Sequence, residues 1–140
     1  MEREELERLG KAVIDSLFEV HRELGPGLLE NAYEMALCHE LTLRGIRFER
    51  QKPQAVVYKS TTLDCGFRID VMVADEVLLE LKSVDASLPI HEAQLINYLK
   101  LADKRLGFLV NFNVPKIKDG IKRRVNNLDA DPRRPRDFNL

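Results

Sequence analysis

The sequence has 140 residues, a formal net charge of −1 from 22 Lys and Arg against 23 Asp and Glu, and 44% hydrophobic residues. These values fit one globular domain over residues 1–140 and exclude an intrinsically disordered chain. The sequence has no apolar run of the roughly 20 residues that a membrane-spanning helix needs, and its charged amino terminus is unlike a signal peptide. We therefore expect a cytoplasmic protein that does not enter the membrane.

Charge is unevenly distributed along the chain. Residues 1–50 carry 7 basic and 11 acidic groups, whereas residues 116–140 carry 8 basic and 4 acidic groups. The overall balance argues against nucleic-acid binding through bulk positive charge. We expect residues 116–140 to form a basic tail, which is either simply solvated or in contact with phosphates.

Two helices are predicted at the amino-terminal end. Apolar residues recur there at steps of three and four, the pattern of one face of an amphipathic helix: Leu6, Leu9, Val13, Leu17, Val20 and Leu24. The Gly-Pro-Gly turn at residues 25–27 ends this helix because proline cannot continue it. A second helix is predicted over about residues 28–44, with Gly45 as a fitting left-handed cap.

The hydrophobic period then changes to two, which predicts strands. The predicted elements are extended segments at 46–58, 67–73 and 77–84, a helix at 89–104 and a last strand at 107–114. Pro53 in the first segment is typical of an edge strand or a bulge. The last strand–helix–strand unit should be parallel and the earlier hairpins antiparallel. The fold class is therefore α/β, with a mixed sheet flanked by helices on both faces.

Two carboxylates occupy unusual positions in the predicted strands. Asp70 and Glu80 each alternate out of phase with the apolar residues of their strand. If residues 74–76 form a three-residue loop, Asp70 lies directly opposite Glu80, with Cβ atoms about 4.5–5.5 Å apart. Two like charges at this separation destabilise a sheet unless a cation or a proton lies between them.

Lys82 and Glu30 extend this charged group. Lys82 shares one strand face with Glu80, and a buried lysine beside carboxylates is costly unless it has charged partners or a chemical role. Glu30 shares an otherwise apolar stripe of the second helix, although an acid at a helix start is also favoured by the macrodipole. Oxygen-rich clusters of this kind suit Mg²⁺ or Mn²⁺, and a nearby lysine could stabilise a hydroxide nucleophile.

Several short motifs follow one another in a fixed order. These are G-x-x-E-x-x-Y at 27–33, Phe-Arg-Ile-Asp at 67–70, Glu-Leu-Lys at 80–82 and Q-x-x-x-Y at 94–98. Together they resemble the GxxExxY protein family, which is placed in the PD-(D/E)xK nuclease-like superfamily, over roughly residues 15–126. The resemblance implies a restriction-endonuclease-like core with the element order α-α-β-β-β-α-β. Ile69 stands where the superfamily motif is named for a proline. This proline is commonly absent in the superfamily, so the difference does not affect the implied site.

The resemblance also implies roles for individual residues. Asp70 and Glu80 would be metal ligands, Glu30 would complete the acidic metal site, and Lys82 would position the attacking water. Gln94 would join them in the catalytic set.

Two further side chains, Tyr98 and Arg68, would bind the substrate. Gln94 and Tyr98 match a Q-x-x-x-Y element of some superfamily exonucleases that helps to place the nucleophile or the strand; taken alone, they are equally a surface glutamine beside a core tyrosine. Arg68 could contact phosphates together with the basic tail.

These observations predict a Mg²⁺- or Mn²⁺-dependent nuclease that hydrolyses phosphodiester bonds of nucleic acid, with DNA favoured over RNA. Because the chain is short, a homodimer or a partner protein would help to form the substrate groove. Two alternatives stay open. One is a non-catalytic module that keeps the nuclease fold and binds nucleic acid or protein, and the other is a metal-dependent hydrolase of another phosphorylated substrate, such as a nucleotide.

Overall fold

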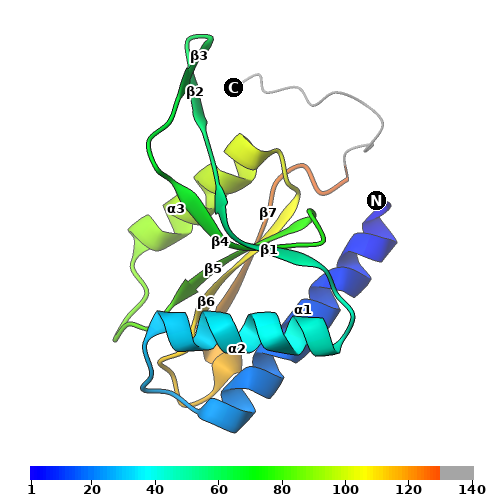
Figure 1. The fold of residues 1–140 in the computed structure, drawn as a ribbon, viewed down its shortest axis with the longest axis vertical. Helices are drawn as coiled ribbons and strands as arrows, with labels where there is room; N and C mark the ends of the chain where they lie inside the picture. The colour runs from blue at the N-terminus through cyan, green and yellow to red at the C-terminus, as the bar shows by residue number, and fades with distance from the viewer. Residues whose placement is uncertain (130–140) are drawn as a thin grey trace.

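The structure of the protein is a computed structural model that describes residues 1–129 (Figure 1). Its elements are α1 (Arg3–Leu24), α2 (Glu30–Leu43), β1 (Phe48–Pro53), β2 (Val56–Tyr58), β3 (Thr61–Leu63), β4 (Arg68–Val73), β5 (Val77–Lys82), α3 (Pro89–Ala102), β6 (Leu106–Asn111), a 3₁₀ turn (Ile117–Gly120) and β7 (Ile121–Val125). Within the described residues, no helix combines the length and apolar character needed to cross a membrane.

The main sheet has five strands in the order β1-β4-β5-β6-β7, and β2 pairs with β3 in a separate hairpin. The β5 and β6 strands are parallel, and every other neighbouring pair in the main sheet is antiparallel. The predicted α/β class and the parallel unit built from β5, α3 and β6 are therefore confirmed. Pro53 ends the edge strand β1, where its missing N–H costs no ladder hydrogen bond.

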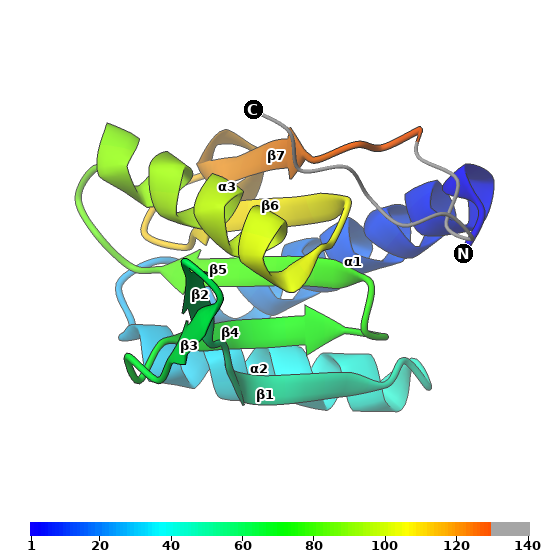
Figure 2. The same ribbon diagram turned by 90° about the horizontal axis from the view of Figure 1, so that it is seen from above.

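Helices cover the two faces of the sheet, as Figure 2 shows from above. On one face, α1 and α2 pack their buried leucines against Val71, Leu79 and Val110. On the other face, α3 packs Leu95 and Leu99 against residues of β4, β5 and β6. The sheet is thus the middle of three layers, and a polar group placed on it is removed from bulk water unless the layers part.

The carboxyl-terminal part differs from the prediction. Residues 121–125 form β7 and pair with β6, so this part of the expected basic tail is an edge strand of the sheet. Its sequence, Ile-Lys-Arg-Arg-Val, places charges where an edge strand faces water, which leaves little of the alternating apolar pattern that identifies a strand. Residues 130–140 of the expected tail lie outside the described residues.

The β2–β3 hairpin is a second feature that the sequence pattern did not resolve. The extended chain at 55–58 was expected, but its partner strand was not. Figure 1 shows this hairpin projecting from the sheet on the side of α3. Lys59 and Ser60 at its tip both have positive φ, which fits a two-residue turn of the type that joins tight hairpins.

Candidate active site

Tyr33 fixes the entry into α2. Its hydroxyl donates a hydrogen bond to the Gly25 carbonyl at 2.6 Å and accepts one from the Leu28 N–H at 3.1 Å. Its ring stacks on Phe112, with centroids 4.3 Å apart and an interplanar angle of 3°. Gly27 in the intervening turn has φ +100°, a conformation that favours glycine. This buried tyrosine therefore sets the position of the first turns of α2, which carry Glu30 and Glu34.

The β4–β5 hairpin brings Asp70 and Glu80 together. Val73 pairs with Val77 across the three-residue loop, and the register continues to Val71 opposite Leu79. This is the register predicted from the sequence, and the next position places Asp70 beside Glu80. There the backbone ladder ends, and the Asp70 carboxylate accepts the Leu81 N–H at 2.8 Å.

The alternation of β4 also breaks at this point. Ile69 packs with Met72 on the α3 side, although a regular strand would place it on the other face with Val71 and Val73. The regular alternation expected along this strand therefore does not extend from Val71 to Ile69. Because the backbone ladder ends here, the Asp70 carboxylate reaches the Leu81 N–H of β5. Glu34 of α2 and Lys82 of β5 both act on its charge, since Glu34 raises and Lys82 lowers the pKa of Asp70.

Glu80 is the most perturbed acid of the site. It is only 7% exposed, and its Oε1 atom is buried without a hydrogen-bond partner among the described residues. Burial, followed by the negative charge of Asp70, raises the pKa of Glu80 to about 8. Burial is also the largest cause that raises the pKa of Asp70, and the Leu81 N–H opposes it. Near neutral pH the pair therefore carries less than two full negative charges.

Lys82, at the end of β5, is half-buried beside this pair. Its ammonium makes neither a hydrogen bond nor an ion pair with any residue in the described part of the chain, although its charge lowers the pKa of both Asp70 and Glu80. The backbone holds it in place because the Lys82 carbonyl accepts the Phe112 N–H at 2.9 Å. The structure thus leaves a cation beside the carboxylates that is free to contact a bound molecule.

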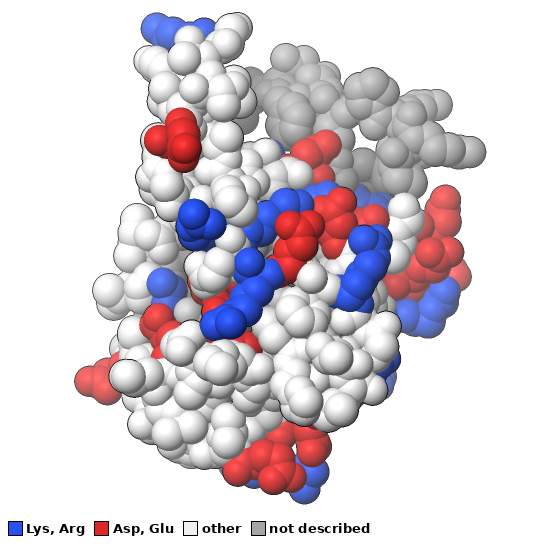
Figure 3. All heavy atoms as spheres, viewed as in Figure 1, with Lys and Arg blue, Asp and Glu red and all other residues white. Residues whose placement is uncertain are grey.

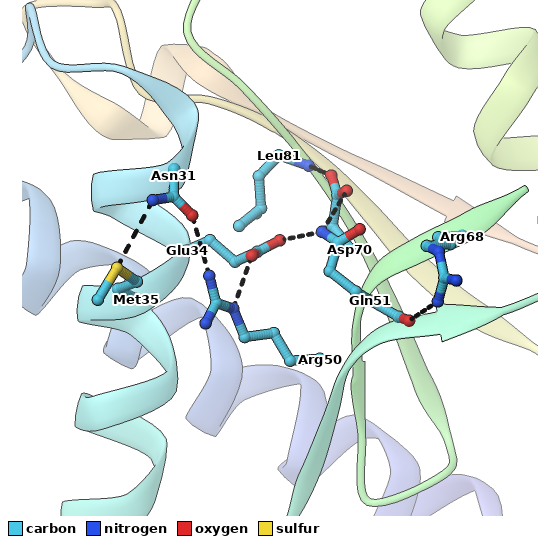
Figure 4. A network of polar contacts seen from close by, with 8 residues as sticks. All are labelled: Asn31, Glu34, Met35, Arg50, Gln51, Arg68, Asp70 and Leu81. Atoms are coloured by element: carbon cyan, nitrogen blue, oxygen red, sulfur yellow. Dashed lines mark hydrogen bonds and ion pairs between the residues drawn. The ribbon is translucent and has the colours of Figure 1, made fainter.

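A second acid, Glu34, joins the site from α2, and the sequence pattern did not single it out (Figure 4). Glu34 is 6% exposed, and its Oε2 accepts from Arg50 Nε at 2.7 Å. Its Oε1 accepts from Gln51 Nε2 at 2.6 Å. Glu34 lies one helical turn after Glu30, so the i,i+4 spacing of the two acids was the signal that could have identified it.

Gln51 connects Glu34 to Asp70. Its amide nitrogen donates to Glu34 Oε1 at 2.6 Å and to Asp70 Oδ1 at 3.3 Å. Figure 4 shows Gln51 between the two acids, with both contacts drawn. Its backbone has φ +53° within β1, a left-handed conformation that is unusual for a residue other than glycine and is often found at functional sites. The backbone twist at Gln51 thus coincides with the point where its side chain reaches both acids.

Glu30 lies at the rim of this group. It is exposed, and its Oε1 accepts the Ser83 N–H at 3.3 Å. A small cavity of about 170 Å³ joins it to the other acids, lined by Glu30, Asn31, Glu34, Gln51, Asp70 and Leu81. Among residues 1–129, however, no three His, Cys, Asp or Glu side chains are arranged to hold a metal ion. The structure brings Asp70 and Glu80 together, whereas Glu30 shares the cavity lining with Asp70 but makes no hydrogen bond to either acid among the described residues.

The remaining predicted residues come from β4 and α3. Arg68 is exposed, and its guanidinium donates to the Gln51 carbonyl at 3.2 Å. Tyr98 is close enough to the acids that burial and the charges of Glu80 and Asp70 raise the pKa of its phenol. Gln94 is exposed one turn earlier on α3, and within the described residues its amide makes no hydrogen bond with the carboxylates.

The donor set at Asp70 and Glu80 fits a small hard cation. Mg²⁺ is usually bound in proteins by one or two carboxylates, with waters and substrate phosphates completing its coordination, so three protein acids are not required. The unsatisfied Glu80 Oε1 and the raised pKa of both acids mean that the two ionised carboxylates are costly here unless a proton or a positive charge lies beside them. A divalent cation would supply that charge.

The comparison with protein families agrees with this geometry. The family described as the PD-(D/E)XK nuclease superfamily matches residues 7–124, a range that includes β4, β5 and α3. The chain matches none of the curated proteins and none of the solved structures compared with it. Since the matched range covers most of the sequence and contains the acidic pair and its lysine, the chain belongs to the PD-(D/E)XK nuclease superfamily.

Proposed function

We propose that this protein is a metal-dependent nuclease that hydrolyses phosphodiester bonds of nucleic acid, with DNA as the favoured substrate. The observation that supports it most directly is the buried, unpartnered Glu80 Oε1 beside Asp70, with the unpaired ammonium of Lys82 next to both among the described residues. Family membership points to the same chemistry. Within this superfamily, we also propose that the chain is a member of the GxxExxY family.

Asp70 and Glu80 would hold the cation, Mg²⁺ or Mn²⁺, that the superfamily implies. When bound, such a cation lowers the pKa of a water molecule and neutralises charge that develops on the phosphate. The Leu81 N–H keeps the Asp70 carboxylate in one orientation at 2.8 Å. Glu30, across the small cavity, would act on the site through water.

Lys82 would stabilise negative charge on the attacking water and on the phosphate. Such preorganised charges cost no rearrangement during the reaction and are often a large part of catalysis. Gln94, Tyr98 and Arg68 would contact the substrate strand at the edge of this site.

The surface around the site is electrostatically mixed. Figure 3 shows basic and acidic side chains side by side across the middle of one face. Some basic side chains are paired with acids, since both Lys52 and Lys104 contact Asp75, at 3.1 and 3.2 Å. Binding would therefore depend on local contacts more than on a uniformly basic surface. A second copy of the chain or a partner protein would extend the groove.

The test is a cleavage assay with labelled single-stranded, duplex and branched DNA and RNA. Metal-free wild-type protein would receive Mn²⁺ or Mg²⁺, and Lys82→Ala and Lys11→Ala would run beside it. Lys11 is an exposed lysine of α1 that pairs with Asp15, so it controls for the loss of one positive charge far from the site. We expect metal-dependent cleavage by the wild type and by Lys11→Ala, and none by Lys82→Ala.

Three results would contradict the proposal. Cleavage by Lys82→Ala at the wild-type rate would remove this lysine from the mechanism. Salt-sensitive binding of nucleic acid without cleavage by any form would favour the non-catalytic module, and turnover of free nucleotides alone would favour a different phosphohydrolase.

A further inference from the structure

A second, larger cavity lies beside the proposed active site, between α3 and the start of β4. Its volume is about 500 Å³, which is within the range of sites that bind small organic groups. Val56, Phe67, Tyr98 and Leu101 supply its apolar lining. Val56 comes from the β2–β3 hairpin, so that projecting hairpin forms one wall.

Polar groups are placed around this apolar lining. Gln94, Asn97 and Lys100 also line the cavity, all from successive turns of α3. The side-chain amides of Gln94 and Asn97 make no hydrogen bond to any residue among 1–129, so their donors and acceptors are available to a ligand. Lys100 adds a positive charge. The cavity thus offers an apolar slot, two free amides and one cation.

Two aromatic residues connect the cavity to the carboxylates. The rings of Phe67 and Tyr98 meet edge to face, with centroids 6.1 Å apart. Tyr98 lies within the electrostatic reach of Glu80 and Asp70. Phe67 precedes Asp70 by three residues, about 10 Å along an extended chain. A nucleotide strand with one phosphate at Asp70 would therefore bring a base one or two nucleotides away to the cavity.

We propose that this cavity binds one unpaired nucleobase of the substrate strand, close to the phosphate that is cleaved. The inference rests on the proposed nuclease function and adds to it a single-stranded or frayed segment as the preferred substrate. A nucleobase is flat, stacks on aromatic rings, and presents donors and acceptors at its edge that amides can match. Lys100 would contact the adjoining phosphate.

The surroundings of the cavity favour a nucleobase over an apolar peptide. Phe67 is 42% exposed although it borders a cavity, so a flat ring can reach it without displacing the protein. Among the described residues that line the cavity, Lys100 is the only cation, so stacking would supply affinity that surface charge does not. An apolar peptide would leave both amides without partners, which is costly when they are desolvated.

The test measures binding without cleavage. A short single-stranded DNA oligonucleotide with one 2-aminopurine would be titrated into Lys82→Ala protein, and the fluorescent base would be moved along the oligonucleotide. The variants Phe67→Ala and Phe67→Leu would be compared in that background. Phe18→Ala is the matched control, because Phe18 is a 44% exposed phenylalanine on α1, away from this cavity.

We expect the fluorescence of 2-aminopurine to be quenched at one position, with the quenching lost in Phe67→Ala and kept in Phe18→Ala. Binding should weaken about tenfold in Phe67→Ala and when that base is replaced by an abasic site. Phe67→Leu, which keeps apolar volume without an aromatic face, should behave like Phe67→Ala. Thermal unfolding would verify that the variants fold.

The proposal is overturned if Phe67→Ala binds the base-containing and abasic oligonucleotides as the Lys82→Ala parent does. Cleavage by the wild type together with that result would leave the nuclease function standing without the base site. Loss of quenching in Phe67→Ala without cleavage by the wild type would instead keep the base site and remove the nuclease function. Equal weakening by Phe18→Ala would also overturn it, because the effect would not belong to this cavity.

Discussion

The carboxylate of Asp70 accepts the backbone N–H of Leu81 at 2.8 Å, at the point where the β4–β5 ladder ends. A side chain thus takes a donor that a continuing ladder would give to a backbone carbonyl. Beyond this point the strands are no longer joined by ladder hydrogen bonds. The buried Glu80 carboxylate lies there, close enough to Asp70 and Lys82 for both charges to shift its pKa. The contact between Asp70 and Leu81 therefore both ends the strand pairing and orients the Asp70 carboxylate in the site.

Replacement of Asp70 separates its structural role from its charge. Asp70→Asn keeps an oxygen for the Leu81 N–H and removes a charge that opposes Glu80, so the metal-free variant should be at least as stable as the wild type near pH 8. Asp70→Ala leaves that buried N–H without an acceptor and should lose about 1–3 kcal/mol. Thermal unfolding with a chelator present measures both. An equal loss in the two variants would mean that the charge itself stabilises the fold.

The stability of the metal-free protein should decrease as pH rises, because of Glu80. Its pKa is about 8 in the folded protein, above the ordinary glutamate value of 4.5, so folding favours the protonated form. This contribution is fully present below pH 4.5 and is lost as pH rises through about 8, by up to about 1.4 kcal/mol per pH unit. Urea unfolding of the wild type and Glu80→Gln at several pH values measures the difference. A constant difference across this range would contradict the prediction.

Metal binding should release a proton between about pH 6 and pH 8, since a cation needs the ionised form of Glu80. The apparent affinity for Mn²⁺ should therefore rise with pH by up to about tenfold per unit and level off near pH 8. Calorimetric titration in buffers with different ionisation enthalpies counts the released protons. If Glu80→Gln released as many protons as the wild type, the protons would come from another group.

Gln51 should be required for activity more than for stability. Gln51→Gly removes the amide that contacts Glu34 and Asp70 and also relieves the backbone at φ +53°. Gln51→Ala removes the same amide but keeps the strained backbone, so it should be about 1 kcal/mol less stable than Gln51→Gly. Both variants should cleave at least about tenfold more slowly. Wild-type cleavage by Gln51→Gly would show that the amide does not position Asp70.

The central fold could be predicted from the sequence because its signals are local. The periodicity of α1, the apolar runs of β4 and β5, and the three-residue loop at 74–76 fix the register that places Asp70 beside Glu80. The β7 strand lacks such a signal, since its charged residues suit an edge strand and a solvated tail equally well.

The inner part of the site depends on contacts between distant segments. The i,i+4 spacing from Glu30 makes Glu34 a candidate, but a helical sequence does not distinguish an exposed acid from a buried acid paired with an arginine. Gln51 carries no motif, and its role comes from a left-handed backbone that the local sequence does not demand. Both follow from the packing of α2 against β1, a tertiary relationship that periodicity does not encode.

The proposed nuclease function is best tested by measuring metal binding and cleavage in the same buffer. Mn²⁺ binding by calorimetry and single-turnover cleavage of labelled single-stranded and duplex DNA would be measured for the wild type, Lys82→Ala and Lys11→Ala. We expect all three proteins to bind Mn²⁺ similarly and only Lys82→Ala to fail in cleavage. Cleavage by Lys82→Ala at the wild-type rate, or a wild type that binds Mn²⁺ and cuts none of the substrates, would contradict it.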